Sequence, residues 1–306
     1  MVAELSAGRA SADRVSPQRS GGVGEPRRVG YLYVLPALAV YVLFLLFPLL
    51  HSGWLSLFDW DGLSVGTFTG LDNYRRLFAE EGAAAAFGHV GVLILFFAVL
   101  PVVIGLVLAT AMYRVKVRGL PFFRTALFLP QVVAMVVVAV AWQRIFAPDG
   151  VLNQVLGTPG RAWLGDSGTA LLAVGIVGTW VQTGLAMVLF LGGIGKIPAE
   201  LFDAARLDGA GPAGEFRAVI LPALRGEIGV ALTLTVIAAL RTFDLVYMMT
   251  PLGGPGGSTT VPAYEIYQRA FHSGQVGSAA AIGVAITLLA FAVTYLITWI
   301  AGRERT

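Results

Sequence analysis

The sequence predicts an all-α membrane protein with six transmembrane helices, and three observations support that prediction. Of its 306 residues, 57% are hydrophobic and only 13% are charged, which is too apolar for a soluble domain of this size. Long uncharged runs recur along the chain, each close to the ~20 apolar residues that cross a bilayer. Most of the 21 Lys and Arg residues fall in alternate connecting segments, which is the pattern of cytoplasmic loops.

Six apolar runs mark the expected spans. Five are uninterrupted, and the one that is fifth in chain order contains Arg241 and Asp244 but is otherwise as apolar as the rest. Together they predict one transmembrane domain over residues 29–302. The spans are expected at about residues 30–50, 90–113, 123–145, 169–195, 227–250 and 278–301.

The distribution of positive charge predicts the orientation. The N-terminal segment, the segments after the second and fourth spans and the C-terminal segment carry most of the Lys and Arg. Because cytoplasmic segments retain positive charge, both termini are expected in the cytoplasm. Residues 1–28 are rich in Ser, Gly, Ala and Arg without apolar periodicity, which predicts a disordered cytoplasmic tail.

Several chemistries find no support in the sequence. The chain has no Cys and only 3 His, which lie in separate segments, so neither a metal site nor a catalytic triad is indicated. The Gly-rich stretch 253–257 lacks the lysine of a phosphate-binding loop and is interpreted as a turn at the outer face. The sequence therefore indicates no nucleotide-phosphate site on this chain, which is expected not to be an enzyme. The net charge of +3 is explained by topology and does not indicate nucleic-acid binding.

The segment between the fourth and fifth spans, residues 196–225, has the signals of two short helices. Pro198 suits a first helical position and Gly209 a C-terminal cap. Pro212 is expected to start the second helix and Pro222 to end it. Residue type alone favours a helix that lies on the headgroups or packs against its own bundle.

The spacing of this segment favours a different interpretation. The stretch DAARLDGAGPAGEFRAVILP, Asp203 to Pro222, resembles the signature loop of ABC importer permeases, in which EAA is followed by three residues, Gly, nine residues, an aliphatic residue, one residue and Leu-Pro. Asp for Glu and Val219 for Ile are the only departures. The resemblance implies the fold of a type I ABC importer permease, whose first loop helix docks on the cytoplasmic ATPase and transmits its closure. It implies that coupling role for Leu201, Phe202, Asp203, Ala204, Ala205, Asp208 and Gly209.

Further motifs extend the resemblance over residues 30–302 and indicate the sugar-transporting branch. The stretches Phe68 to Phe78, Phe123 to Gly157 and Phe243 to Phe271 look like segments of the maltose and glycerol-3-phosphate permease subunits, except for one extra residue in TPLGGP. The resemblance implies a heterodimer with a sister permease, two ABC ATPase subunits that bind ATP and Mg²⁺, an extracytoplasmic solute-binding protein and a sugar substrate. It also implies a location in the bacterial inner membrane, whose lipid is the remaining partner.

The same resemblance implies a solute site on the fourth and fifth spans. A sugar offers hydroxyls, for which Gln and Thr are suitable partners, while small residues leave room for the ring. The alternative is that these residues pack and hydrogen-bond helices, as Gly, Thr and Gln also do in membranes. The implied positions are Gly178, Gln182, Thr235, Ala239 and Thr242.

Two charges lie inside the fifth span. Arg241 and Asp244 are three residues apart, so on one helix they would share a face and could form an ion pair. A structural pair near the interface and a polar gate at the outer end of the path are both open.

Rival functions follow from other classes of membrane protein. The nearest is an ABC permease for another solute, such as a polyamine or a phosphate ester. A secondary transporter would need coupling-ion sites and usually an inverted repeat, whereas the spans are nearly free of carboxylates and no repeat is visible in the sequence. A membrane-embedded enzyme would need converging catalytic groups, which are not visible.

Overall fold

The computed structural model describes residues 27–114 and 119–302. The tail expected over residues 1–28 lies outside these ranges except for Arg27 and Arg28, which open the first helix. The chain divides into two compact units, one ending at Leu49 and the other beginning at Leu50.

The described residues of the first unit form one apolar helical run, whose last helix continues past Leu49 to Leu55. Residues Tyr33–Leu55 form 23 helical residues, and an 18-residue stretch of them has a mean hydropathy of 2.4. The helix continues five residues past the expected end of the first span at residue 50. The run comprises α1 (Arg27–Tyr41), η1 (Val42–Leu46) and α2 (Phe47–Leu55).

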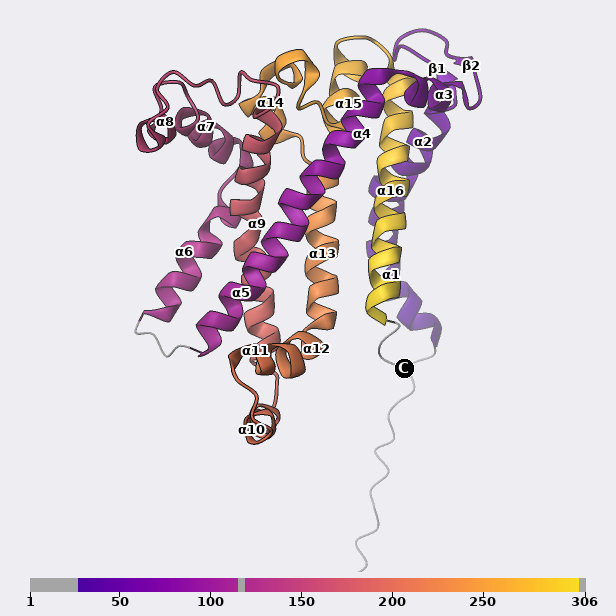
Figure 1. Cartoon of the computed structure of the whole chain (residues 1–306). Coiled ribbons are helices and arrows are strands. Elements are labelled where there is room, and N and C mark those ends of the chain that lie inside the picture. The colour runs from indigo at the N-terminus through magenta and orange to yellow at the C-terminus, as the bar shows by residue number, and fades with distance from the viewer. Residues whose placement is uncertain (1–26, 115–118, 303–306) are drawn as a thin grey trace, which may run out of the picture. The chain divides into compact units, whose positions relative to one another are not determined.

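Three further unbroken helical runs in the second unit are long and apolar enough to cross a membrane. The first of them starts about two turns before the expected residue 90, and the other two match the expected spans within two residues (Figure 1). They consist of α4 (Glu81–Ile94) with η2 (Leu95–Val99) and α5 (Leu100–Arg114), then α9 (Ala170–Ile194), then α16 (Val276–Gly302).

The span expected at 123–145 is not straight. It consists of α6 (Leu120–Val132) and α7 (Met135–Ile145), which meet at a bend of 101°. Pro130 has no N–H to continue the helix ladder, and Ala134 adopts extended backbone angles, φ −56° and ψ 131°. The helix therefore stops within a turn of the proline.

The span expected at 227–250 is also broken. It consists of α13 (Arg225–Leu240) and α14 (Asp244–Met249), with residues 241–243 outside any helix. The break leaves Arg241 and Asp244 exposed while Leu245 is completely buried. A continuous helix would fix the direction of these side chains together, whereas the break lets α14 turn its apolar face into the core.

Three helical runs contain a π-helix just before a proline. Each π-helix has five residues, and one residue separates it from Pro48, Pro101 or Pro222, in VLFLLFP, LFFAVLP and FRAVILP. The wider π turn gives room to the proline ring, which would clash with the carbonyl of an ordinary α turn. At Pro101 the carbonyl of Phe96 lacks its backbone donor, and the Thr179 hydroxyl of α9 donates to it over 2.6 Å.

Short elements cover the upper end of the second unit in Figure 1. The only strands in the described ranges pair antiparallel, Phe58 opposite Phe68, so the all-α prediction misses one small hairpin. Arg269 holds this end together, because it is buried, donates to Ser278 and forms ion pairs with Glu80 and Glu265. The elements are β1 (Phe58–Asp59), β2 (Thr67–Phe68), α3 (Asp72–Ala79), α8 (Val151–Leu156), η4 (Pro251–Gly253), η5 (Pro255–Gly257) and α15 (Pro262–Phe271).

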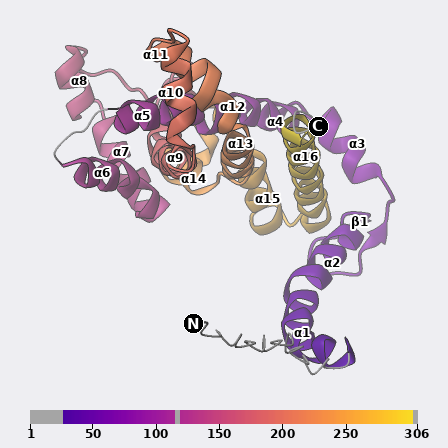
Figure 2. The same cartoon turned by 90° about the horizontal axis from the view of Figure 1, so that it is seen from below.

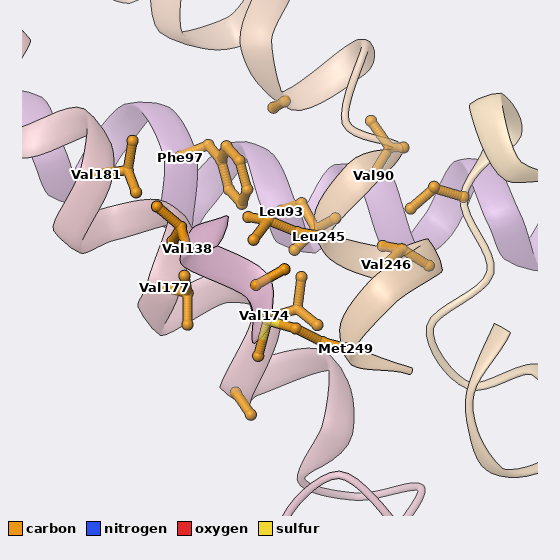
Figure 3. Packing of buried hydrophobic residues seen from close by; sticks show 14 of the residues in the cluster. Val90, Leu93, Phe97, Val138, Val174, Val177, Val181, Leu245, Val246 and Met249 are labelled. Carbon is orange, nitrogen blue, oxygen red and sulfur yellow. The ribbon is translucent and has the colours of Figure 1, made fainter. Parts of the chain in front are cut away.

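Two large apolar clusters form the core of the second unit, and a small third cluster joins Leu77 and Ala83 to Ile282. The first joins α4 and η2 to α7, α9 and α14, and Figure 3 shows Phe97 beside Val181 and Val138 within it. The second joins α5 to the other half of α9 and to the loop that follows, and it includes Phe190 and Phe202. Both α9 and α13 contribute to the two large clusters, and α9 is buried over most of its length.

Candidate functional site

The first helix of the loop after α9 is α10 (Ala199–Leu207). Figure 1 places it at the lower end of the second unit, and Figure 2, which views the protein from that side, shows it with α11. Pro198 lies one residue outside α10 and not at its first position, with φ −58° and ψ 136°. Its extended ψ is incompatible with helix, so α10 begins at the next residue.

Gly209 caps α10 as expected from its place in the motif. Its φ is +82°, the left-handed region that glycine alone adopts at little cost. The Gly209 N–H donates to the Arg206 carbonyl over 3.0 Å, and the Ala210 N–H donates to the Ala205 carbonyl over 2.9 Å. These two bonds form a Schellman motif, which closes the helix end and turns the chain toward α11.

The exposed surface of α10 differs in two residues, Phe202 and Ala205, from the expected coupling set, and Ala205 is half-buried against the second core cluster. Leu201 and Leu207 are 51% and 89% exposed, and Asp203, Ala204, Asp208 and Gly209 are exposed as well. Phe202 is only 4% exposed and stacks on Tyr113 of α5 with 5.5 Å between ring centroids. Phe202 therefore anchors α10 to its own bundle, and the surface available to a partner is formed by the other residues.

The second half of the loop stays helical beyond its expected end. The chain passes Pro222 in a helical conformation, because the π turn makes room for its ring, and bends by 70° only before Arg225. The segments are α11 (Pro212–Glu215), η3 (Phe216–Ile220) and α12 (Leu221–Ala223).

A buried carboxylate joins both halves of the loop to α5. The Glu215 side chain is 8% exposed, and its two oxygens accept from Arg114 over 2.6 Å and from Arg206 over 3.0 Å. Arg114 also donates to the Pro212 carbonyl, and Arg206 also pairs with Asp203. A buried carboxylate is stable only when paired in this way.

Three of the five expected solute positions are used for packing. A Cβ at Gly178 would lie 2.0 Å from the Phe97 ring, so this glycine makes room for an aromatic side chain of the adjacent helix. Ala239 is completely buried in the first core cluster. The Thr235 hydroxyl is also completely buried and donates to the Ala231 carbonyl of its own helix over 2.8 Å. These three residues fit the alternative that they pack the helices.

The other two expected solute positions are Gln182, whose amide oxygen has no hydrogen-bond partner among the described residues, and Thr242, which lies at the helix break. Gln182 is 5% exposed, and its Oε1 atom has no hydrogen-bond partner in the described part of the chain. A buried amide oxygen without a partner costs roughly 1–3 kcal/mol. Thr242 is 8% exposed and lies in the segment between α13 and α14. These two residues remain the strongest candidates for contact with a polar solute.

The proposed partnership of Arg241 and Asp244 is wrong. Within the described ranges no ion pair of 4.0 Å or less joins them, because the helix ends at Leu240 and a new one begins at Asp244. The two residues therefore do not share a helical face. A gating role for either charge stays a prediction.

An aromatic cluster at the break was not predicted from the sequence. The rings of Phe243 and Tyr247 stack with 5.1 Å between centroids, and Tyr267 lies 5.3 Å from Tyr247 and 5.6 Å from Phe271. The hydrogen bond with Tyr247, and then desolvation, raise the pKa of the Tyr267 phenol. The spacing of the aromatic residues in the sequences of α14 and α15 is the signal that could have predicted this cluster.

The Gly-rich stretch after α14 is a compact double turn. Leu252 has φ 59° and is the one non-glycine residue of the described ranges with positive φ, so the extra residue of TPLGGP is accommodated in a left-handed turn. The Thr259 hydroxyl donates to the Thr250 hydroxyl over 2.7 Å, and the His89 ring contacts the Thr260 carbonyl over 2.8 Å. Three or more metal-ligating side chains do not cluster anywhere in the described ranges.

Comparison with known proteins defines the class. The family described as "Binding-protein-dependent transport system inner membrane component" matches residues 101–306, and the chain belongs to it. It is a membrane-embedded permease subunit of an ABC importer, a transport subunit and not an enzyme. An importer of this family works with a separate ATPase, which hydrolyses ATP, and with a solute-binding protein.

Individual relatives and solved structures agree with that class. The chain is 36% identical to the "Probable ABC transporter permease protein YurN" of Bacillus subtilis (strain 168), covering 90% of this chain and 96% of the relative. It is 34% identical to the diacetylchitobiose uptake system permease protein NgcF of Streptomyces coelicolor, covering 87% and 80%. The fold resembles a bacterial alginate ABC transporter solved with an alginate pentasaccharide-bound periplasmic protein, at a TM-score of 0.77, 20% identity, and coverage of 90% and 95%.

Proposed function

We propose that this chain forms half of the translocation path of a sugar importer, paired with a sister permease and bound to two cytoplasmic ATPase subunits. The observation that carries the proposal is the exposed, Schellman-capped helix α10 within the family's signature spacing. The names of relatives support the sugar: NgcF is a diacetylchitobiose permease, and a relative in Thermococcus litoralis, 34% identical over 88% of this chain, is a trehalose/maltose permease.

The orientation and the location of ATP are part of the same proposal. Both termini and α10 lie in the cytoplasm, as the distribution of Lys and Arg predicts. ATP and Mg²⁺ bind the ATPase subunits. An extracytoplasmic binding protein delivers the solute to the opposite face of the membrane.

The mechanism is alternating access without covalent chemistry. Closure of the ATPases on ATP moves α10, and the helices around the solute change between outward-facing and inward-facing arrangements. The loaded binding protein and ATP drive this change only because they bind the two arrangements unequally. Gln182 and Thr242 contact hydroxyls of the solute during passage.

The test is solute competition in proteoliposomes that contain the whole complex, with a binding protein outside and ATP inside. Disaccharides and short oligosaccharides are expected to compete with the transported label, because Gln and Thr suit hydroxyls, whereas a polyamine and a phosphate ester are not. Competition by only the polyamine or the phosphate ester would replace the sugar with that solute. Uptake that is independent of ATP and driven by an ion gradient would contradict the ABC mechanism.

A further inference from the structure

The C-terminal turn of α5 contacts both halves of the coupling loop. Its Tyr113 stacks on Phe202 of α10, which is buried at 4% exposure. Its next residue, Arg114, binds Glu215 over 2.6 Å and the Pro212 carbonyl over 3.1 Å. One helix end thus holds α10 by an aromatic contact and α11 by an ion pair.

The Glu215 carboxylate makes these two contacts parts of one unit. It is almost completely buried and accepts from Arg114 of α5 through one oxygen and from Arg206 of α10 through the other. A carboxylate shared by two guanidinium groups fixes the distance between them more firmly than a single exposed pair does. Any displacement of α10 must therefore move α5 or break this buried network.

The other end of the run that contains α5 packs against the candidate solute helix. Along α5 itself, a Cβ at Gly105 would lie 2.8 Å from Ala186 of α9, so the two helices are in close contact. Next to α5, the ring of Phe97 lies against Gly178, one turn from Gln182. Interiors packed this closely transmit displacement, because side chains cannot move independently.

We propose that the C-terminal turn of α5, through Tyr113 and Arg114, receives the movement of α10 and carries it to the solute-facing part of α9, with Glu215 as the positioning residue between them. The inference rests on the proposed function, since it names the route by which the coupling loop acts. The alternative is that movement of α10 reaches the membrane helices only along the backbone, through α9 before the loop and α13 after it.

The test uses purified complex in proteoliposomes and measures solute moved per ATP hydrolysed. Arg114→Met cuts the link at α5 and leaves Glu215 paired with Arg206, so the variant is expected to fold and to assemble with the ATPase. Basal ATP hydrolysis is expected to persist, while solute moved per ATP falls about fivefold or more, the usual lower bound of an allosteric coupling. Tyr113→Leu is expected to act in the same direction, and Tyr113→Phe to behave as wild type, since it keeps the ring.

Matched controls separate this route from general damage. Arg124→Met makes the same change on exposed α6, where no ion pair to Arg124 occurs in the described ranges, and is expected to leave solute moved per ATP within about twofold of wild type. Glu215→Gln combined with Arg114→Met is expected to be no worse than the more damaging single variant, because Glu215→Gln already removes the ion pair with Arg114 that Arg114→Met removes.

Wild-type solute moved per ATP in Arg114→Met and Tyr113→Leu would overturn the inference. Failure of either variant to assemble would also overturn it, because the contacts would then hold the fold and not transmit movement. A wild-type complex without ATP-dependent uptake would contradict the proposed function itself, so the two failures are distinguishable.

Discussion

Gly209→Val is expected to abolish the response of ATP hydrolysis to the loaded binding protein. Gly209 has φ +82° and forms the Schellman cap of α10. An L-residue in this region costs about 1–2 kcal/mol, and a β-branched side chain is among the least tolerant. The loop is expected to relieve the strain by opening the last turn of α10, which displaces Leu207 and Asp208.

The bundle itself should tolerate the change. A Cβ at Gly209 would meet nothing within 4 Å, so the effect comes from backbone conformation and not from a clash. The measurement is ATP hydrolysis by purified complex with and without loaded binding protein, together with the amount of ATPase that copurifies.

Gly211 offers a matched control two residues further on. It also has open space around its Cβ, but its φ of −76° and ψ of −176° suit any residue. Gly211→Val is therefore expected to keep normal coupling. Equal behaviour of the two variants, whether both are active or both inactive, would contradict the role assigned to the left-handed cap.

Gln182→Leu is expected to reduce the apparent affinity for solute about tenfold, while the amount of assembled complex stays unchanged. The Oε1 atom of Gln182 is buried without a partner in the described part of the chain, so leucine removes no hydrogen bond of the fold. A hydrogen bond to the solute contributes roughly 0.5–1.5 kcal/mol, and about 1.4 kcal/mol corresponds to a tenfold change in affinity. Thr242→Val should act in the same direction. Uptake kinetics as a function of solute concentration provide the measurement.

Thr235→Val is the matched control for these variants. Its hydroxyl is completely buried and already donates to the Ala231 carbonyl, so the affinity for solute is expected to stay within about twofold of wild type. Unchanged kinetics in Gln182→Leu and Thr242→Val would show that these two residues only pack the helices.

Hydropathy predicted where the straight helices lie, because a membrane helix is recognised by length and composition. The bounds of α9 and α16 agree with the expectation within two residues. A hydropathy profile contains no information about the direction of a helix axis, so the bend of 101° between α6 and α7 and the break before Asp244 were not predicted. The π turns before the three prolines depend on carbonyl positions that a sequence pattern does not contain.

The candidate site likewise has features that the sequence predicted and features that it did not. The motif spacing located Gly209 and the exposed face of α10, since the left-handed cap is a local property of the chain. The burial of Phe202 against Tyr113 and the close fit of Phe97 on Gly178 are contacts between distant segments. Residue type alone identified these side chains as apolar or small but could not say what covers them.

Site-specific photo-cross-linking from α10 tests the central claim, that this helix docks on the ATPase, most directly. Leu207 is 89% exposed on α10 and Leu63 is 95% exposed between β1 and β2, so each can carry a photoreactive side chain without disturbing the core. In active complex, the probe at Leu207 is expected to give an adduct with the ATPase subunit, and the probe at Leu63 none. An adduct from Leu63 would contradict the cytoplasmic placement of α10. The absence of an adduct from Leu207 in complex that still transports would contradict the coupling role of α10.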